Sequence, residues 1–403
     1  MPEDHRPSPR DAARAAAWLA RNAVDCLPEG ELERRLATGR QLRVKLGIDP
    51  TAPDIHLGFT VVLTKLREFQ DLGHRVVLIV GDYTARVGDP SGRSSTRPVL
   101  DGAQIDANAR TFAEQALTVL RDDPDLLEVR FNGEWLDMPM ERLFALMRTV
   151  TAGRVLERDD FARRMAAHEP ISMLELLYPL LQGYDSVAVG ADVELGGTDQ
   201  KFNLLLGRDI QRAFGRPEQV VLTMRLLTGT DGVQKMSKSY GNYIGVRDSP
   251  DEIYGRTLSI PDSSLAEWYE LLLDRQADPS LTPRDAKRAL ALELVARFYG
   301  AEAARAAQER FDAIHIRGER PADAPEVCWD GPETVHLPAL LARAFGISTS
   351  QARRALAQGA VRLDGERLAG EQLDMPLAQL AGRVLQLGRR RFARVADGRR
   401  SRA

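Results

Sequence analysis

A buried strand followed by a turn, a helix and a second buried strand, within residues 42–80, is the feature that most constrains this fold. Residues 42–48 read as a strand, residues 75–80 are a nearly continuous apolar strand, and a helix is expected from 56 to 72, ending before Gly73. Strands that read as unbroken apolar runs are buried on both faces, as in a parallel sheet covered by helices. Parallel neighbours also need a crossover helix between them. We therefore predict an α/β fold with a doubly wound, Rossmann-like parallel sheet.

The rest of the chain is divided by its pattern of helices, strands and linkers. Residues 11–27 show helical periodicity, strands are expected at 127–131, 192–196 and 219–224, and every segment from 250 to 315 reads as helix. Residues 317–332 are rich in Pro, Gly and charge and make the best linker. The predicted domains are an N-terminal helical arm (1–40), a Rossmann-like catalytic domain (41–245) with a helical insertion (about 100–181), a helical domain (246–318), a linker (319–334) and a small α+β domain (335–403).

The charges are distributed unevenly between the body of the chain and its end. Residues 336–403 contain 13 Arg and 5 Asp or Glu, whereas the whole chain has a net charge of −3. A basic end on an acidic body favours a nucleic-acid partner, with a solvated Arg-rich tail as the plainer alternative.

No apolar run approaches the roughly 20 residues of a membrane span. The N-terminus lacks a signal-peptide pattern, and Cys26 and Cys328 are too few and too far apart for a zinc site. We therefore expect a cytoplasmic protein with no membrane partner and no protein-bound metal.

The first candidate site follows the first strand, in residues 47–59. Gly47 and Asp49 lie where that strand should end, and Thr51, His56 and Gly58 lead into the next helix. Parallel sheets bind ligands at the carboxyl ends of their strands, and free N–H groups at a helix start attract phosphate. A His-x-Gly at a helix start is weak by itself, since helix capping explains it as well. Neither of the usual glycine-rich nucleotide fingerprints is present.

The second candidate site is the stretch Lys235-Met236-Ser237-Lys238-Ser239, which follows a turn-forming Gly-Thr-Asp-Gly. The chain has only six lysines against 49 arginines, so two in five residues stand out. Two lysines in a polar loop can neutralise a triphosphate, although a solvated basic loop is the alternative. Taken together, the His-Leu-Gly segment and this string, in this order, resemble the signature pair of class I aminoacyl-tRNA synthetases.

The motif Tyr-Pro-Leu-Leu-Gln-Gly-Tyr-Asp narrows the resemblance to bacterial tyrosyl-tRNA synthetases. Its Tyr178, Gln182 and Asp185 are four and three residues apart and so share one helix face. By this resemblance, Tyr178 and Gln182, with Asp89, hold the ammonium group of tyrosine, Asp185 accepts a hydrogen bond from its phenol, and Gln200 lies in a substrate-binding turn. For any one of these residues, a polar stripe in an ordinary cleft is the alternative.

The resemblance covers about residues 42–395 and implies an activity. The enzyme would activate tyrosine with ATP, accompanied by Mg²⁺, and transfer it to tRNA(Tyr), acting as a homodimer joined through the helical insertion. Phosphate contacts are implied for Thr51, His56, Lys235 and Lys238, and further nucleotide contacts for Gly47, Asp49, Gly58, Phe59, Gly197 and Asp199.

The final segment resembles a small RNA-binding module shared with a ribosomal protein. Its marks are a hairpin-like stretch at 361–366 and a closing strand expected at 384–395. The resemblance implies tRNA contacts by the helical domain, which would bind the anticodon, and by the module. In the module the implied contacts are Arg353, Arg354, Arg389, Arg390 and Arg391.

Two positions depart from the pattern of that family. Phe59 stands where most members have a second histidine that helps bind the nucleotide sugar, and Lys45 stands where many have a tyrosine beside the phenol. Phe59 leaves two alternatives open, a specialised or inhibitor-tolerant second isoform and a catalytically weakened RNA-binding paralogue. A tryptophan enzyme is the nearest other synthetase, and Asp185 disfavours it. The missing phosphate loop disfavours a kinase or a general ATPase.

Overall fold

The computed structural model describes residues 8–50, 54–90, 102–317, 324–388 and 391–398. Thr51, Arg389 and Arg390, three of the predicted site residues, lie outside these ranges. The chain divides into two compact units, residues 1–298 and 299–403. Among the described residues, no helix has the length and apolar character to cross a membrane.

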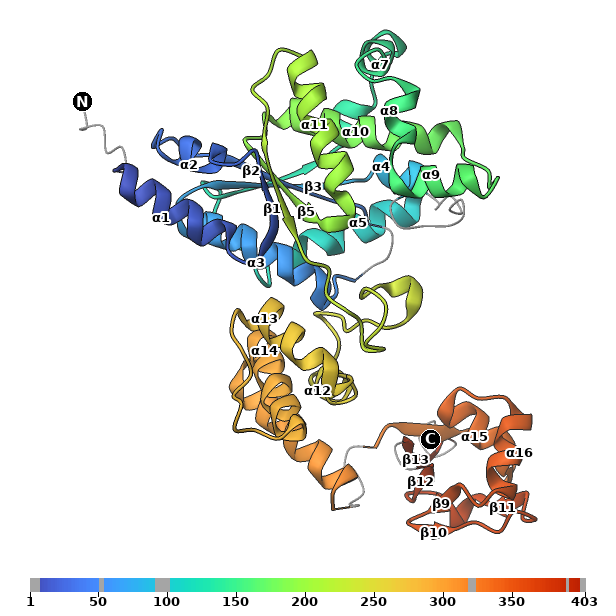
Figure 1. The fold of residues 1–403 in the computed structure, drawn as a ribbon. Helices are drawn as coiled ribbons and strands as arrows, with labels where there is room; N and C mark the ends of the chain where they lie inside the picture. The colour runs from blue at the N-terminus through green and yellow to red at the C-terminus, as the bar shows by residue number, and fades with distance from the viewer. Residues whose placement is uncertain (1–7, 51–53, 91–101, 318–323, 389–390, 399–403) are drawn as a thin grey trace. The chain divides into compact units, whose positions relative to one another are not determined.

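A six-stranded sheet with the order β1-β6-β5-β2-β3-β4 is the centre of the first unit (Figure 1). Neighbouring strands are parallel except β1, which runs antiparallel to β6. The predicted Rossmann-like parallel sheet is therefore confirmed. Its strands are β1 (Ala23–Leu27), β2 (Arg43–Ile48), β3 (Arg75–Val80), β4 (Leu127–Phe131), β5 (Val193–Gly197) and β6 (Val220–Met224).

Helices cover both faces of this sheet (Figure 1). On one face α10 and α11 pack against each other, and on the other α3 and α5 contact β3. The helices up to α11 are α1 (Pro9–Ala20), α2 (Glu31–Leu36), α3 (Leu57–Asp71), α4 (Thr84–Val87), α5 (Gly102–Ala116), α6 (Gly133–Leu136), α7 (Met140–Met147), α8 (Ala152–Leu156), α9 (Asp159–Ala166), α10 (Met173–Val189) and α11 (Lys201–Ala213). The middle of the chain is thus helical apart from β4, as predicted.

Helix α10 begins and ends at residues whose chemistry sets those limits. Ser172 accepts a hydrogen bond from the backbone of Leu174, and the Glu175 side chain accepts one from the Ser172 N–H in return. Gly190 then ends the helix with a φ of +60°, a backbone conformation that residues other than glycine rarely adopt. Between these caps the helix stays continuous past residue 181, the expected end of the insertion.

The N-terminal segment corrects one prediction. Residues 11–27 were expected to be one helix, but α1 ends at Ala20, and residues 23–27 form the edge strand β1. Arg21 is extended and Asn22 has a φ of +62°, so the helix cannot continue. The apolar residues of 23–27 fit a strand as well as a helix, and pairing with β6 decides between them because Cys26 lies opposite Leu222.

The segment from 250 to 315 is helical, as predicted. It contains α12 (Pro250–Leu258), α13 (Leu265–Leu273) and α14 (Pro283–His315). Helix α12 starts at a Ser249 cap followed by proline, and α13 stops at Asp274, which has a φ of +52°. Helix α14 is broken at Gly300, where φ is +85°.

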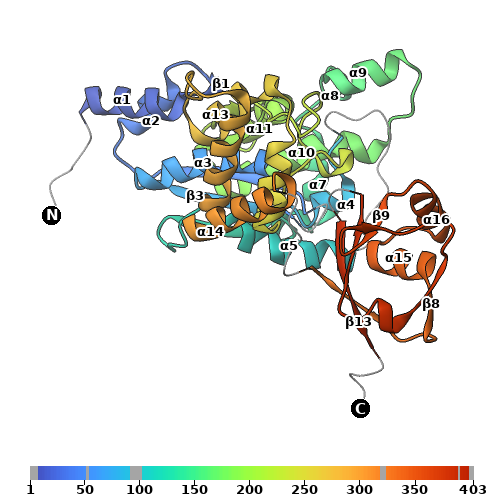
Figure 2. The same ribbon diagram turned by 90° about the horizontal axis from the view of Figure 1, so that it is seen from below.

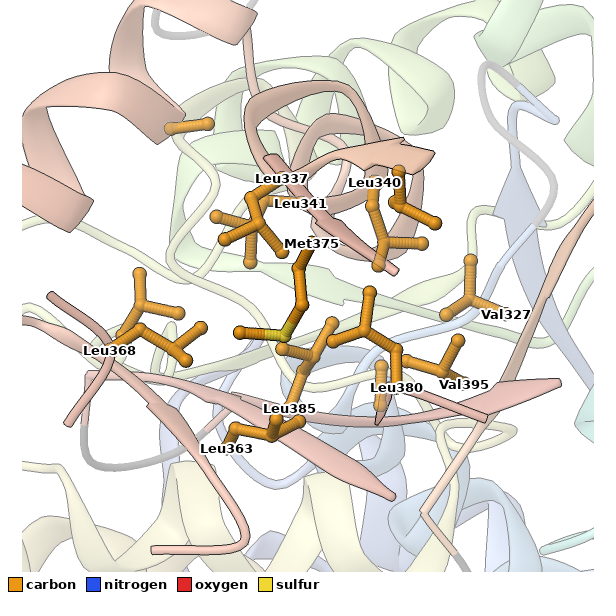
Figure 3. Packing of buried hydrophobic residues seen from close by; sticks show 14 of the residues in the cluster. Val327, Leu337, Leu340, Leu341, Leu363, Leu368, Met375, Leu380, Leu385 and Val395 are labelled. Carbon is orange, nitrogen blue, oxygen red and sulfur yellow. The ribbon is translucent and has the colours of Figure 1, made fainter. Parts of the chain in front are cut away.

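The second unit ends in a small α+β domain with a five-stranded sheet of order β10-β9-β12-β13-β7 and a two-stranded sheet of β11 and β8. Helices α15 and α16 pack together and lie on one side of β13 (Figure 2). Apolar side chains including Leu340, Leu385 and Val395 fill the space between helices and sheet (Figure 3). The elements are β7 (Glu326–Trp329), β8 (Thr334–His336), α15 (Leu337–Phe345), α16 (Thr349–Ala357), β9 (Val361–Leu363), β10 (Glu366–Arg367), β11 (Asp374–Pro376), β12 (Val384–Leu387) and β13 (Arg391–Asp397).

Two expectations about this region were wrong. Residues 326–329, within the expected linker, form β7, which pairs in parallel with β13. Val327 explains the pairing, since it lies opposite Val395 and is buried with it in the domain core. The expected single strand at 384–395 is a pair of antiparallel strands, β12 and β13, because Gly388 adopts a φ of +66° between them. The other predicted domain boundaries stay predictions.

Candidate active site

A cavity of about 490 Å³ opens at the carboxyl ends of the parallel strands. This is the edge of an open α/β sheet where ligands are expected. Its walls come from β2, β3 and β5, the start of α3, helix α10 and the loop after β6. The predicted site residues that line it are Gly47, Asp49, His56, Gly58, Phe59, Asp89, Tyr178, Gln182, Asp185, Gly197, Asp199, Gln200, Lys235 and Lys238.

One wall is the start of α3, where His56 is the N-cap residue. Its Nδ1 accepts a hydrogen bond from the Gly58 N–H at 3.2 Å. Burial, with the nearby charges of Lys238 and Lys235, lowers the pKa of His56 to about 3, so the imidazole is neutral at physiological pH. A side chain at Gly58 would place its Cβ 3.0 Å from the His56 ring, which explains the glycine. Phe59 packs its ring against that of His56, with centroids 4.6 Å apart.

The lysine-containing segment also lines the cavity, and residues that follow it in the chain are bonded to the His56 segment through the main chain. The Leu57 N–H donates to the Ile244 carbonyl, and the Val246 N–H donates to the Ile55 carbonyl, both at 2.9 Å. A Cβ at Gly58 would lie 3.6 Å from Met236 Cβ, so the two motifs, which are far apart in the sequence, lie close together in the cavity.

The lysines themselves are held in different ways. Lys235 Nζ forms an ion pair with Asp199 at 2.6 Å. Lys238 Nζ lies 5.0 Å from the centre of the Phe112 ring, and burial lowers its pKa to about 8. Asn242, which no motif indicated, accepts from the Ser237 N–H at 2.8 Å and donates to Asp231 at 2.8 Å, so it fixes the shape of the loop.

Asp49 and Tyr178 meet across the cavity. The Tyr178 hydroxyl donates to Asp49 Oδ2 at 2.9 Å, and the Thr84 hydroxyl donates to Asp49 Oδ1 at 2.7 Å. Burial and the nearby Asp49 carboxylate raise the pKa of Tyr178 well above its ordinary value, so its hydroxyl keeps its proton. Thr84 was not singled out in the sequence.

Amide side chains join the remaining polar residues into one network. Gln200 Nε2 donates to Asp89 Oδ2 at 2.8 Å. Asn203 Nδ2 donates to both Gln182 Oε1 at 2.9 Å and Gln200 Oε1 at 3.1 Å. Arg158 in turn donates to Asn203 Oδ1 at 3.0 Å. The sequence indicated the three lining residues but gave no signal for Asn203 and Arg158, which hold them in place from behind.

Asp185 lies buried on α10 and is oriented by two donors that the sequence did not single out. Trp135 Nε1 donates to Asp185 Oδ1 at 2.8 Å, and Asn132 Nδ2 donates to Oδ2 at 3.4 Å. Burial raises the pKa of Asp185 to about 6, against the opposing charge of Lys45 and these hydrogen bonds. The carboxylate is thus a poorly solvated acceptor that faces the cavity.

Lys45 lies behind the cavity wall and is not one of the lining residues. It is fully buried, and its ammonium contacts Glu194 Oε1 at 2.7 Å, Ser186 Oγ at 2.8 Å and the Gln182 carbonyl at 2.9 Å. Its three donors are therefore used on β5 and α10. Lys45 supports the turn of α10 that carries Gln182 and Asp185.

The predicted RNA-contacting residues belong to the second unit. Arg353 and Arg354 lie on α16 and Arg391 begins β13, and all three are exposed. Among the described residues, no group of three or more His, Cys, Asp or Glu side chains is arranged to hold a metal ion.

Residues 37–315 match the family described as tRNA synthetases class I (W and Y). The chain is 49% identical to a tyrosine–tRNA ligase of Moorella thermoacetica, with 96% of each chain covered. It is also 49% identical to one of Thiobacillus denitrificans, with 94% of this chain and 98% of the relative covered. Among solved structures, the tyrosyl-tRNA synthetase of Aeropyrum pernix matches with a TM-score of 0.59 at 23% identity, covering 75% of this chain and 99% of that one. That of Archaeoglobus fulgidus, complexed with L-tyrosine, matches with a TM-score of 0.58 at 23% identity, covering 74% of this chain and 99% of that one. These two likenesses concern the fold.

Proposed function

Because this chain belongs to the class I tRNA synthetases, within the tyrosine–tRNA ligase family, we propose that it activates L-tyrosine with ATP and transfers the amino acid to tRNA. The observation that carries the proposal is one continuous cavity lined by both the buried Asp185 and the pair Lys235 and Lys238. A site of this kind can hold a phenolic amino acid next to a triphosphate. The relatives that are tyrosine–tRNA ligases, at 49% identity over most of this chain, favour tyrosine over tryptophan as the amino acid.

The tyrosine would lie toward α10. Its ammonium group would bind among Asp89, Tyr178, Gln182 and Gln200, where the polar side chains are already held by one another. Its phenol would donate to Asp185. Because Trp135 and Asn132 hold that carboxylate before substrate arrives, little reorganisation would be needed on binding.

The ATP would lie toward the start of α3, with Mg²⁺ arriving as part of the nucleotide complex. The neutral His56 would donate from Nε2 to a phosphate oxygen, because its Nδ1 already accepts from the Gly58 N–H. The N–H groups of Leu57, Gly58 and Phe59 are already bonded within the protein, so the phosphate contact at this helix start would come from the His56 side chain. Lys235 and Lys238 would neutralise the triphosphate, with Lys235 exchanging its ion pair with Asp199 for a phosphate contact. Thr51 is proposed as a further phosphate ligand. Gly47, Asp49, Gly58, Phe59, Gly197 and Asp199 would contact the rest of the nucleotide.

The reaction needs no covalent enzyme intermediate. A tyrosine carboxylate oxygen attacks the α-phosphorus of ATP, the bond to the β-phosphate oxygen breaks, and pyrophosphate leaves with that electron pair. A terminal ribose hydroxyl of the tRNA then attacks the carbonyl carbon of tyrosyl-adenylate, releasing AMP. Catalysis in such transfers comes from positioning and charge stabilisation.

The assembly of the enzyme is proposed on separate grounds. Met140, Phe144 and Met147 are 60%, 50% and 40% exposed and lie on one face of α7, spaced by four and three residues. An exposed apolar face of this kind favours a protein interface, and we propose a homodimer formed through the helical insertion.

The basic terminal domain, with Arg353, Arg354 and Arg389–Arg391, and the helical segment 250–315 would contact tRNA. The cytoplasmic location stays a prediction.

A charging assay tests the complete reaction. Incubation of the protein with ATP, labelled tyrosine and tRNA(Tyr) transcript should give tyrosine bound to tRNA through an alkali-labile ester. Tryptophan in place of tyrosine is the control and should give none. If tRNA binds but no amino acid is transferred, the RNA-binding paralogue becomes the better account.

A further inference from the structure

Three carboxylates lie along α13, Glu267 and Glu270 within the helix and Asp274 at the residue that ends it. Glu267 and Glu270 are three residues apart, which places them on the same face of the helix. Each of the three contacts a residue of the first unit outside α13. Glu267 contacts Thr228, Glu270 contacts Arg225, and Asp274 contacts Arg21. Only the first of these contacts reaches the lysine loop, residues 228–242.

Glu267 holds Thr228 at the root of the lysine loop by both of its oxygens. Oε1 accepts from the Thr228 N–H at 2.7 Å, and Oε2 accepts from the Thr228 hydroxyl at 2.9 Å. The next residue, the fully buried Trp268, donates from Nε1 to the Thr228 carbonyl at 3.1 Å. Every polar group of Thr228 is therefore bonded to α13, either at its carboxylate or at its indole.

Thr228 is paired directly with Lys235. The two form an antiparallel bridge, flanked by hydrogen bonds from the Met236 N–H to the Leu227 carbonyl at 2.7 Å and from the Gly229 N–H to the Gln234 carbonyl at 2.8 Å. The backbone of Lys235 cannot move without Thr228 while these bonds are present. Lys235 Nζ, at the end of this chain of contacts, lies against Asp199 in the cavity.

We infer that Glu267 is a positioning residue for the reaction. It fixes the position of the lysine loop relative to the cavity, through Thr228 and the bridge from Thr228 to Lys235. The inference rests on the proposed function for the role of Lys235. Glu267 is absent from the cavity lining, so it acts on the reaction only through the loop. Charge stabilisation by a preplaced lysine is sensitive to small displacements, which is why the anchor should affect the rate.

The other two carboxylates make this inference testable without detaching α13. Glu270 forms an ion pair with Arg225. Asp274 bonds to Arg21 at 2.7 Å, and Arg21 bonds to Glu68 on α3 at 2.8 Å. Removing Glu267 leaves these anchors and the buried Trp268 in place, so helix α13 should stay docked.

The experiment compares Glu267→Ala, Glu267→Gln and the control Glu252→Ala in the full-length protein. Glu252 is an exposed acid of α12 that pairs with Arg256 in its own helix. In tyrosine-dependent pyrophosphate exchange, kcat should fall about tenfold or more for Glu267→Ala, the size expected when a charge-assisted anchor is removed, while KM for tyrosine changes less than about twofold. Glu267→Gln should recover most of kcat, because its amide can still accept from the Thr228 N–H and donate to the Thr228 hydroxyl oxygen. Glu252→Ala should behave as the unmodified chain.

Amide hydrogen exchange supplies a readout that needs no activity. In Glu267→Ala the amides of Thr228 and Met236 should exchange faster while those of α10 are unchanged. If the unmodified chain shows no pyrophosphate exchange, the proposed function fails but this measurement still tests the anchor. A kcat within about twofold of the unmodified chain, an equal loss through KM for tyrosine, or unchanged protection at Thr228 and Met236 would each overturn the inference.

Discussion

Asp185 combines three properties that suit it to recognise a phenol. It is buried, it faces the cavity, and two donors, Trp135 and Asn132, fix its orientation. A substrate without a hydroxyl would leave this desolvated carboxylate without the hydrogen bond from the substrate. Such a loss costs about 1–3 kcal/mol, and more when the group is charged. Selectivity against phenylalanine would therefore come from the free energy of an unmade hydrogen bond.

Substitution of Asp185 should relax that selectivity. In Asp185→Ala the unpaired acceptor is gone, so the ratio of kcat/KM for tyrosine to that for phenylalanine should fall by at least about tenfold. Exchange assays with each amino acid measure the ratio. An unchanged ratio would remove Asp185 from the recognition of the phenol.

Asp185 should also make tyrosine binding depend on pH. Burial raises its pKa in the free protein to about 6, and the phenol is best accepted by the ionised carboxylate. Below about pH 6 the Asp185 carboxyl is mostly protonated and must lose its proton before tyrosine binds. The KM for tyrosine should therefore be constant above about pH 7 and should increase by up to about tenfold for each pH unit below about 6. Asp185→Asn should remove the rise. A KM that stays flat between about pH 5 and 8 would contradict this assignment.

Phe59 is the residue at which a hydrogen bond to the nucleotide sugar is expected to be missing. Its ring packs on His56 and lines the cavity, and it offers no hydrogen-bond donor. In Phe59→His a donor would become available for the nucleotide sugar, and the activation rate should rise by up to about 10- to 100-fold, the equivalent of one hydrogen bond of 1–3 kcal/mol. Phe59→Leu is the control, because it removes the aromatic ring without adding a donor. No change or a fall in Phe59→His would show that the phenylalanine suits this site.

At the scale of elements, β2 and α10 are joined by a buried charge beneath the site. Lys45 and its partner Glu194 are 0% and 1% exposed. In Lys45→Met, Glu194 would be left as an uncompensated buried charge, so the free energy of unfolding should fall by about 3–5 kcal/mol. Lys45→Met with Glu194→Gln should recover much of the loss, because no buried charge remains. Urea denaturation measures both, and equal stabilities of the single and double variants would refute this explanation.

The elements also show what sequence patterns can and cannot predict. Strands β3 and β4 were predicted with their observed limits because β3 is a continuous apolar run and turn signals bound both. Tyr178, Gln182 and Asp185 were predicted from the resemblance of their motif to a known family, and helix periodicity placed the three on one face. Strand β1 was missed because its apolar residues fit the periodicity of a helix as well as that of a strand. Only its pairing with β6 shows that the segment is a strand.

The residues behind the site could not be predicted, for a related reason. Asn132 and Trp135 follow β4, Arg158 precedes α9, and Asn203 lies on α11, so no local motif joins them. Their roles appear only when these elements pack around α10. The burial of Lys45 likewise depends on β5 and α10, which lie about 140 residues further along the chain.

At the scale of the whole molecule, the basic terminal domain should act on tRNA binding and leave tyrosine activation unchanged. Replacing Arg353, Arg354 and Arg391 by Ala should weaken tRNA binding and reduce the slope of log K against log salt by about 0.7–0.9 for each phosphate that the protein no longer neutralises. Fluorescence titration of labelled tRNA at several salt concentrations measures the slope. A control variant lacking Arg34, Arg121 and Arg212, which are exposed on the first unit, should change it less. Loss of pyrophosphate exchange in the terminal variant would contradict the separation of roles.

The central claim is that the cavity at the carboxyl ends of the strands activates tyrosine and no other amino acid. The most direct test is amino-acid-dependent exchange of labelled pyrophosphate into ATP by the full-length protein, with tyrosine, tryptophan and phenylalanine compared at equal concentration. We expect exchange with tyrosine and none above background with the other two. Exchange with tryptophan or with phenylalanine, or no exchange with tyrosine, would contradict the claim.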